Sequence, residues 1–479
     1  MRCLAFASTL REAGATCWFA GLADTVAAVP VLSQSGHHWL SIDAPGDAIS
    51  LRRGLTHAGV KACDWLIVDH YGWSDTEEAA CRAWARNIMV IDDLADRHHD
   101  CDLLLDQTFG RAPADYEGLV PSSATKLLGT AYSLLRPEFV IARSDALRRR
   151  SSGALRRVLI AMGLTDAPGA TSRVLLPLLA NELSIKIDVA LGDAAPHLAE
   201  VEQLVAQSGG RVELHRASPA MDTLMTRADF AFGAAGSTSW ERCCLGLPTA
   251  LITIADNQRE IAARLSEASA AIHLGTLDKV DPHLIAGVVR DLMRDPAQLI
   301  AMSRAAAAIC DGRGCARAAM WLVPERAENG ENIWLRPVTT ADCDALFGWQ
   351  CEPGARRYMR TPRVPTAEEH RAWLAAKLND PDCLLNIVVQ DDAPMGSLRL
   401  DQVEPGAFEI SIVIGTAFQG RGLGRAALSL ARRLVPEAEL RAEIVAGNAR
   451  SDNLFTAAGF EPRGYGMRRL PPLKTATLH

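Results

Sequence analysis

Short apolar runs that end in polar residues recur through the first two thirds of the sequence, and this rhythm constrains the fold more than any other feature. After an amphipathic N-terminal helix and a strand at 17–20, such runs occur at 65–69 (WLIVD), 88–92 (IMVID) and 103–106 (LLLD). Helical stretches separate several of them. This alternation predicts βα units whose strands form a parallel sheet.

A polar, arginine-rich segment at 143–157 interrupts the rhythm, and we interpret it as a hinge. Beyond it, apolar runs predict strands at 158–162, 185–191, 230–232 and 249–254. The sequence therefore predicts two doubly wound lobes, residues 1–145 and 155–322. In such a pair the ligand lies between the carboxyl ends of facing sheets.

A charged linker at 324–332 (PERAENGEN) precedes a third region, residues 332–472, with an α+β pattern. Strands are expected at 333–336, 385–390, 396–400 and 408–414, with helices near 340–349 and 366–378. The length of 479 residues is consistent with about three domains.

Composition excludes several classes of partner. A net charge of −7, from 57 acidic and 50 basic residues, does not favour nucleic acid or an anionic membrane. No apolar stretch approaches the roughly 18 residues of a membrane span, and Arg11 and Glu12 interrupt the N-terminus too early for a signal peptide. We therefore expect a cytoplasmic protein.

The twelve cysteines include no C-x-x-C pair, which favours buried thiols in a reducing compartment over disulfides or zinc. A second candidate metal cluster is the run His98, His99 and Asp100, but adjacent side chains diverge, and a solvated loop is the favoured interpretation. No metal is expected.

A glycine-rich turn, Q-G-R-G-L-G at 419–424, follows the strand at 408–414 and opens a helix. Glycine lets the backbone turn sharply and approach a ligand, and the N–H groups of such a turn converge where a diphosphate is stabilised. The predicted contacts are Gln419, Gly420, Arg421, Gly422, Leu423, Gly424 and Arg425.

A second motif, with Asn448, Ser451, Leu454-Phe455 and Gly459-Phe460, follows after one more strand. In this order the two motifs resemble the GNAT acetyltransferase family over roughly residues 332–470. The resemblance implies acetyl-CoA as co-substrate, with the turn on its pyrophosphate and the helix after Asn448 along its pantetheine arm.

Acetyl transfer needs an unprotonated amine and a proton for the leaving thiolate. Many family members supply that proton from a tyrosine where this chain has Phe455, which cannot donate one. Tyr465 is the candidate substitute. The alternative is that Tyr465 is a buried tyrosine with a structural role only. Glu409 is the candidate base, directly or through water, with an outward-facing surface glutamate as the alternative.

The second informative segment is GAAGSTSWERCCLGLP at 233–248. A strand ends in small residues, Ser237 or Thr238 can cap the next helix, and the helix N-terminus favours an anion. Glu241, one turn in, could accept two hydrogen bonds from a ribose diol. The segment resembles GT-B nucleotide-sugar enzymes, including the family that adds N-acetylglucosamine to lipid I. The predicted UDP contacts are Gly236, Ser237, Thr238, Glu241, Asn257 and Gln258.

Further segments at 69–72, 91–97, 99–107, 163–166, 256–258 and 311–314 narrow the resemblance. Together they resemble the UDP-2,4-diacetamido-2,4,6-trideoxy-β-L-altropyranose hydrolases of pseudaminic acid biosynthesis, over residues 1 to about 320. The resemblance implies attack of water at the anomeric carbon with inversion and release of UDP, without a metal.

In that family a strand and a loop carrying the proposed histidine base precede the segment that matches residues 1–5. The resemblance therefore implies a first lobe without its first strand, and little hydrolase activity in the chain as written. His70 is the next candidate base.

The presence of both regions in one chain predicts that they catalyse consecutive steps on one nucleotide sugar. A 4-amino UDP-sugar would be N-acetylated and then hydrolysed, towards a nonulosonic acid for flagellin or surface polysaccharide. Two alternatives stay open: a GT-B glycosyltransferase, and a nucleotide-sugar-binding lobe that serves the acetyltransferase.

Overall fold

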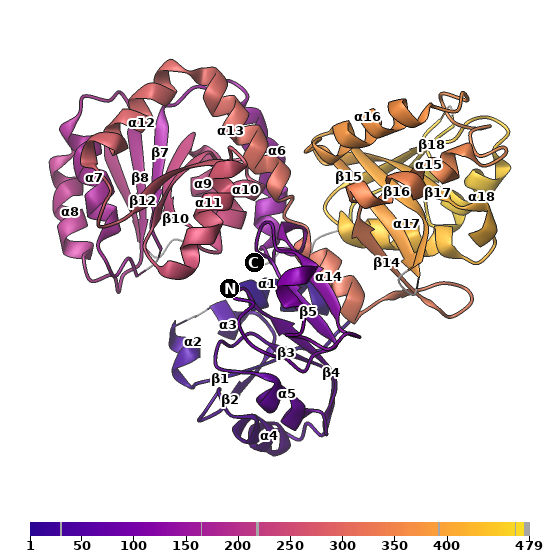
Figure 1. Cartoon of the computed structure of the whole chain (residues 1–479), viewed down its shortest axis with the longest axis horizontal. Helices are drawn as coiled ribbons and strands as arrows, with labels where there is room; N and C mark the ends of the chain where they lie inside the picture. The colour runs from indigo at the N-terminus through magenta and orange to yellow at the C-terminus, as the bar shows by residue number, and fades with distance from the viewer. Residues whose placement is uncertain (29–30, 164, 217–219, 391–392, 465, 474–479) are drawn as a thin grey trace. The chain divides into compact units, whose positions relative to one another are not determined.

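The computed structural model describes residues 1–28, 31–163, 165–216, 220–390, 393–464 and 466–473 (Figure 1). The chain divides into two compact units, Met1–Cys315 and Ala316–His479. The predicted fold class is confirmed: the first unit is a pair of α/β lobes with parallel sheets, and the second is an α+β domain.

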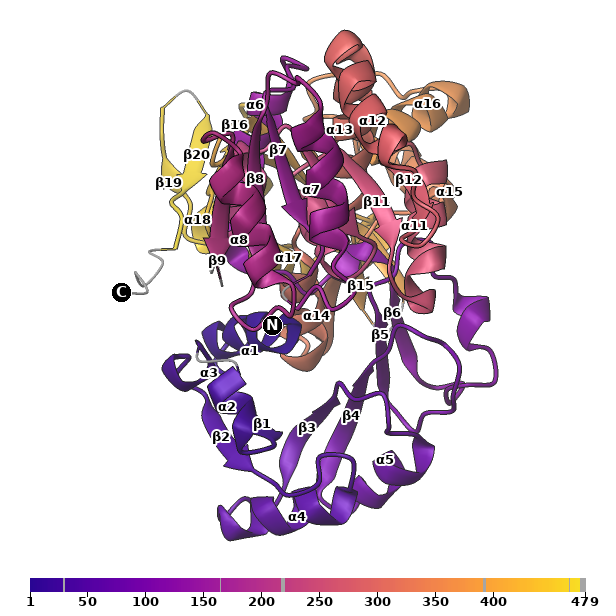
Figure 2. The same ribbon diagram turned by 90° about the vertical axis from the view of Figure 1, so that its left-hand side faces the viewer.

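Two parallel sheets form the first lobe (Figure 2). Four strands pair in the order β3 (Cys63–Val68), β4 (Ala85–Ile91), β5 (Leu103–Asp106) and β6 (Thr125–Leu128). A separate two-stranded sheet pairs β1 (Trp18–Gly21) with β2 (His38–Ser41). The helices of this lobe are α1 (Arg2–Glu12), α2 (Asp24–Ala28), α3 (Val31–Gln34), α4 (Ala48–His57) and α5 (Asp75–Cys81), with 3-10 turns η1 (Pro113–Tyr116) and η2 (Thr130–Tyr132).

The second lobe contains a six-stranded parallel sheet in the order β12-β11-β10-β7-β8-β9. Its strands are β7 (Arg157–Ala161), β8 (Lys186–Leu191), β9 (Val212–Arg216), β10 (Phe230–Ala234), β11 (Thr249–Thr253) and β12 (Ala271–Thr276). Its helices are α7 (Ala170–Ala180), α8 (Leu198–Gln207), α9 (Met221–Arg227), α10 (Thr238–Cys244), α11 (Arg259–Glu267), α12 (Pro282–Arg294) and α13 (Pro296–Ile309), with η3 (Asp256–Gln258).

Helices cover both faces of this six-stranded sheet (Figure 1). Successive strand residues point to opposite faces, so Phe230 and Phe232 enter one core while Ala231 enters the other. Continuous apolar runs such as that of β10 are what burial on both faces requires.

The predicted hinge at 143–157 is wrong, because most of it belongs to helix α6 (Pro137–Arg150). Phe139 and Ala146 of α6 pack in a core of the second lobe. Arg143 and Arg150 are buried, and their guanidinium groups donate to main-chain carbonyls, including that of Cys244 at the end of α10. The sequence predicted that these arginines belong to a polar hinge, whereas in the structure they stabilise the second lobe.

The C-terminal unit is built on one eight-stranded sheet, in the order β13-β14-β15-β16-β17-β18-β20-β19. Its strands are β13 (Glu325–Arg326), β14 (Asn332–Pro337), β15 (Cys383–Gln390), β16 (Ala393–Glu404), β17 (Ala407–Ile414), β18 (Glu439–Glu443), β19 (Glu461–Pro462) and β20 (Met467–Leu470). Its helices are α15 (Cys343–Cys351), α16 (Ala367–Leu378), α17 (Leu423–Leu434) and α18 (Ala449–Ala457), with η4 (Thr340–Asp342) and η5 (Thr416–Phe418).

The predicted linker at 324–332 is also corrected, since much of it is ordered as a hairpin. Glu325 and Arg326 pair with Ile333 and Asn332 as β13 and β14. Met320, from the end of α14 (Gly314–Leu322), is fully buried in the core of this unit. The C-terminal unit therefore begins before the charged segment.

The structure leaves all twelve cysteines as free thiols. Across the described ranges, none of the helices combines the length and hydropathy that crossing a bilayer requires.

Candidate functional site

The second lobe offers a ligand position where its strand order reverses. The chain builds β7, β8 and β9 towards one edge of the sheet and returns to place β10, β11 and β12 on the other side of β7. Ligands of open α/β sheets bind outside the carboxyl ends of the strands at this switch point. The segments that follow β7 and β10 flank it, and both were singled out from the sequence, at 163–166 and 233–248.

The loop after β10 leads through Gly236 and Ser237 into α10. Ser237 occupies the N-cap position of α10, but its hydroxyl makes no capping hydrogen bond, which corrects the predicted capping role. The ideal Cβ position of Gly236 has no heavy atom within 4 Å, so the loop opens onto free space. Thr238 starts the helix and is partly exposed. The uncapped helix start and the open loop leave room for an anion.

The side chain of Glu241, in the first turn of α10, has no hydrogen bond or ion pair to any residue in the described part of the chain. Burial raises the pKa of its carboxyl group, and the nearby charges of Arg136 and Arg242 oppose this only in part. A carboxylate that is desolvated without a partner costs free energy in the empty protein. A ligand hydroxyl pair would offset that cost.

The other two predicted nucleotide contacts lie in η3, at the carboxyl end of β11. Asn257 is exposed, and the Gln258 Oε1 accepts the main-chain N–H of Ile254 at 3.1 Å. Asp166, in the segment after β7, caps α7 by accepting the N–H groups of Ala170 and Thr171 at 2.9 and 2.8 Å. Asp166 is thus engaged in holding the loop.

The first lobe gathers charged side chains at the carboxyl ends of β3 and β4. The Asp69 carboxylate accepts hydrogen bonds from the Arg2 Nε at 3.0 Å and from its Nη2 at 2.6 Å. The Arg2 Nη1 also lies 3.3 Å from the Asp93 Oδ2. The Tyr71 hydroxyl donates to Asp93 at 3.2 Å. Burial would raise the pKa of Asp69, but its bonds from Arg2 outweigh this and lower it. The sequence did not reveal Arg2, because it lies 67 residues from Asp69.

His70 sits in the same segment and is exposed. Its Nδ1 accepts the N–H of Gly72 at 3.1 Å, so only Nε2 is left to act as a base. The predicted solvated loop at 98–100 is wrong for His99, which is buried with its Nδ1 2.8 Å from the Glu78 Oε1.

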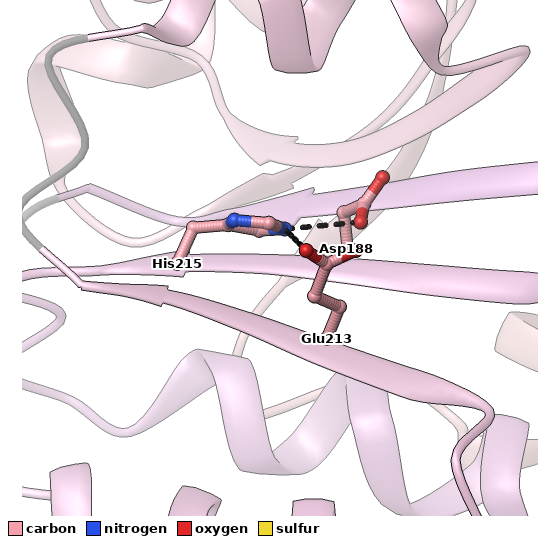
Figure 3. A group of neighbouring side chains, drawn as sticks. All are labelled: Asp188, Glu213 and His215. Atoms are coloured by element: carbon pink, nitrogen blue, oxygen red, sulfur yellow. Dashed lines mark hydrogen bonds and ion pairs between the residues drawn. The ribbon is translucent and has the colours of Figure 1, made fainter.

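Two clusters bring potential metal ligands together. In the first, Asp188, Glu213 and His215 converge from β8 and β9, with the His215 Nε2 3.1 Å from Asp188 (Figure 3). Arg157 and Arg227 both donate to Asp188. A cation would have to displace these guanidinium groups.

The second cluster comprises Asp380, Cys383 and Asp401. Lys377 donates to Asp380 at 3.0 Å and to Asp401 at 2.8 Å, and Arg399 donates to Asp401 at 2.6 Å. Basic side chains therefore already neutralise this cluster as well.

In the C-terminal unit the turn at 419–424 has the predicted strand–turn–helix setting. Gly420 and Gly422 have φ values of +78° and +80°, which residues with a Cβ rarely adopt. The ideal Cβ position of Gly420 has no heavy atom within 4 Å, and no side chain caps α17 at Gly422. Gly424 packs against Leu454, and the Leu423 side chain is buried in the core, so only its main chain can face a ligand.

Two exposed arginines flank this turn. Arg421 donates to the Ala417 carbonyl at 3.2 Å and stacks on Phe418, whereas Arg425 has no hydrogen bond or ion pair within the described ranges. The Gln419 Nε2 donates to the Ile414 carbonyl at 2.9 Å and holds the turn on its strand. The turn therefore combines open main chain with unpaired positive charge.

Strand β17 separates from β18 close to Glu409. The parallel pairing covers only Ala407–Glu409, with Glu409 opposite Arg441, although β17 continues to Ile414 beside β16. Arg360 donates to the Glu409 carboxylate at 2.8 Å and to that of Glu443 at 2.7 Å. The predicted base is thus one of two carboxylates that share a guanidinium at the point of separation.

Asn448 caps α18 by accepting the N–H of Ser451 at 3.2 Å. Phe455 is buried against Phe460. Tyr465 lies outside the described residues. The sequence places one further tyrosine in this unit, Tyr358, whose ring lies 4.0 Å from the ideal Cβ position of Gly447.

Comparison with known proteins separates the two units. Residues 332–461 match the family model of the GNAT acetyltransferase domain. An uncharacterised protein of Methanocaldococcus jannaschii is 24% identical over 341 residues, covering 70% of this chain and 67% of its own length. The UDP-2,4-diacetamido-2,4,6-trideoxy-β-L-altropyranose hydrolase of Campylobacter jejuni is 30% identical over 139 residues, covering 29% of this chain and 47% of its own.

The chain thus spans about two thirds and about half of these two relatives. Among solved structures, MurG of Acinetobacter baumannii is 15% identical, with a TM-score of 0.48, covering 67% of this chain and 94% of that one. Residues 332–461 thus match a GNAT acetyltransferase domain, and the N-terminal part of the chain is similar to a relative named as a UDP-sugar hydrolase.

Proposed function

We propose that this chain acts on a UDP-linked amino sugar, in two steps. Residues 332–472 N-acetylate the 4-amino UDP-sugar with acetyl-CoA, and the lobes at 1–145 and 155–322 hydrolyse the product to free sugar and UDP. One observation carries the proposal: each unit has a glycine-rich turn between a strand and a helix, and that helix has no side-chain cap. This observation supports two separate anion sites in one chain.

The residues at 419–425 fit the pyrophosphate of acetyl-CoA. The open space at Gly420 admits a phosphate to the main chain, and Arg421 and Arg425 supply positive charge. Bound acetyl-CoA supplies the acetyl thioester. Glu409 and Glu443 hold the acceptor amine and accept the proton it releases on forming the amide. Tyr465, or Tyr358 near Gly447, protonates the thiolate.

In the first unit the diphosphate is proposed to lie on the loop at 236–238, with Glu241 accepting hydrogen bonds from the ribose diol. Asp69, Asp93 and His70 are proposed to bind the sugar and the attacking water. The water oxygen bonds to the anomeric carbon, the bond from that carbon to the UDP oxygen breaks, and the water proton passes to the base. The Campylobacter jejuni relative, which is named for this hydrolysis, supports the assignment.

The product would feed pseudaminic or another nonulosonic acid for flagellin or surface glycans. The cytoplasm is the proposed compartment, and the twelve free thiols support it. A second candidate is a GT-B glycosyltransferase that passes the sugar to an acceptor other than water. A third is a binding lobe that delivers the nucleotide sugar to the acetyltransferase.

Mass spectrometry of products distinguishes these functions. The full chain is incubated with a panel of UDP-amino-sugars, with and without acetyl-CoA. We expect an added acetyl group only with acetyl-CoA, followed by free sugar and UDP. Turnover that begins only when a sugar acceptor is added would indicate the glycosyltransferase. Binding of the UDP-sugar without release of UDP would indicate the delivery lobe.

A further inference from the structure

Arg242 of α10 is buried, with 2% of its surface exposed. Its Nη2 donates to the Ala234 carbonyl at 2.7 Å and to the Ser239 hydroxyl at 2.9 Å. Its Nη1 is buried and has no hydrogen-bond partner among the described residues. Burial lowers the pKa of Arg242 to about 10, so the guanidinium is still charged at neutral pH.

The hydrogen-bond partners of this guanidinium are neutral. The charge of the Glu241 carboxylate acts on it, but within the described ranges the two side chains form neither a hydrogen bond nor an ion pair. Burying a charge without a direct ion pair is expensive, even after the surroundings relax. The chain also reserves space for it: a Cβ on Gly233 would lie 2.9 Å from the Arg242 Cζ and still closer to its Nη1. Gly233 therefore has to be glycine because the guanidinium lies against this end of β10.

Arg150 provides a contrast within the same lobe. It is also buried, but its guanidinium donates to three main-chain carbonyls, those of Leu245, Met225 and Ala228. Those bonds make Arg150 a brace at the far end of α10, although its Nε is also buried without a hydrogen-bond partner among the described residues. Arg242 differs in its position: its two bonds join the end of β10 to the first turn of α10, on either side of the loop at 235–237.

We infer that Arg242 is a buried counter-charge for the diphosphate bound between the end of β10 and the start of α10, and that it selects a nucleoside diphosphate over an uncharged nucleoside. The inference rests on the proposed UDP site. The hydrogen bonds of Arg242 go to Ala234 at the end of β10 and to Ser239 in α10, so it is a positioning residue that acts on the ligand through its electric field. Coulomb attraction scales with ligand charge and is strong where the dielectric is low. Uridine, UMP and UDP should therefore depend on Arg242 in increasing order.

Calorimetry of the full chain with these three ligands tests the inference. Arg242→Met fills a similar buried volume without charge and is expected to weaken UDP binding about tenfold or more, UMP less, and uridine by under about twofold. Arg242→Lys keeps the charge and should retain most of the UDP affinity. Arg150→Met is the matched control, and it should leave the ratio of uridine to UDP dissociation constants unchanged.

Equal losses for uridine and UDP in Arg242→Met would overturn the inference, because they would make Arg242 a simple brace. An unchanged UDP dissociation constant would overturn it too. If Arg242→Met fails to fold, the salt dependence of UDP and uridine binding by the wild-type chain tests the inference instead. A buried charge is screened by salt far less than surface charges are. Persistence of the UDP preference over uridine at about 0.5 M salt supports the inference, and its collapse refutes it. No UDP binding by the wild-type chain would instead remove the proposed UDP site.

Discussion

The two glycine-rich segments, at 233–238 and 419–424, look alike in sequence, but glycine is needed for a different reason in each. The turn at 419–424 needs glycine for backbone conformation, since Gly420 and Gly422 have positive φ, and its arginines lie on the surface. In the segment at 233–238, which joins the end of β10 to α10, neither Gly233 nor Gly236 is among the positive-φ residues, and the basic side chain of Arg242 is buried against the end of β10. Glycine permits a turn in one site and a close approach in the other.

This difference predicts which substitutions break each site. The largest effect is expected from Gly422→Glu, which should weaken acetyl-CoA binding at least about a hundredfold, because it adds negative charge and forces a strained φ. Its Cβ would also lie 2.8 Å from the Glu328 main-chain nitrogen, so the melting temperature should fall. Calorimetry and thermal melting measure both. Gly406→Ala is the control for strain, since Gly406 has φ +75° in open space. Unchanged affinity in a folded Gly422→Glu variant would contradict the assignment.

The segment at 233–238 should instead be destabilised by overpacking. Gly233→Ala pushes a methyl group into the Arg242 guanidinium and is expected to cost up to about 3 kcal/mol of unfolding free energy. Gly236→Ala is the matched control, because its Cβ meets no atom within 4 Å, and it should change stability by less than about 0.5 kcal/mol. Denaturant unfolding of both variants checks this. Equal stability would mean that Arg242 moves aside freely.

Glu241 sharpens the comparison, because the turn at 419–424 contains no acidic residue. Glu241→Ala should weaken UDP binding by about 2 kcal/mol, the scale for hydrogen bonds to a charged group. Calorimetry with UDP measures the loss, and an unchanged dissociation constant would place the nucleotide elsewhere.

The raised pKa of Glu241 also predicts whether its charge stabilises or destabilises the folded chain. The folded protein binds a proton there more readily than the unfolded chain, so this group contributes stability as pH falls through its folded pKa, and costs stability at neutral pH. Glu241→Gln should therefore raise the melting temperature at pH 7 of the unliganded chain while weakening UDP binding. A lower melting temperature would contradict the unpartnered carboxylate.

The smallest effect on stability is expected from Arg360→Ala. The Arg360 side chain is 64% exposed, and exposed ion pairs contribute about 0–1 kcal/mol. Its effect should appear instead in the KM for the amine acceptor, because Glu409 and Glu443 lose a shared cation that fixes their positions. Steady-state kinetics and thermal melting separate the two. A large drop in melting temperature with unchanged KM would make Arg360 a structural residue only.

Most strands that the sequence missed lie at sheet edges, although it predicted the edge strands β1 and β3 and missed β20 inside a sheet. The missed strands β2, β6, β9 and β12 each lie at the edge of a sheet, where only part of the strand is buried. An apolar run is the signal of burial on both faces, so such strands give little signal. The arginines of α6 misled the prediction for the opposite reason. They are polar in sequence but buried in the structure, because main-chain carbonyls inside the lobe accept their hydrogen bonds.

The main-chain parts of the candidate sites follow from local sequence, because glycine spacing sets the turn. The side chains that complete them do not. Arg360 meets Glu409 and Glu443 across 49 and 83 residues, and Arg2 meets Asp93 across 91. Such meetings depend on which strands become neighbours, which a single sequence does not state.

The short pairing between β17 and β18 has a consequence for amide hydrogen exchange. From Ile410 to Ile414, main-chain groups on the side away from β16 lack the strand partner that Ala407–Glu409 have in β18. Their amide hydrogens should exchange with deuterium far faster than those that donate to β16. A molecule that lies along this edge would slow them selectively. Mass-resolved exchange over these five residues would thus report occupancy of the acetyltransferase unit without any turnover.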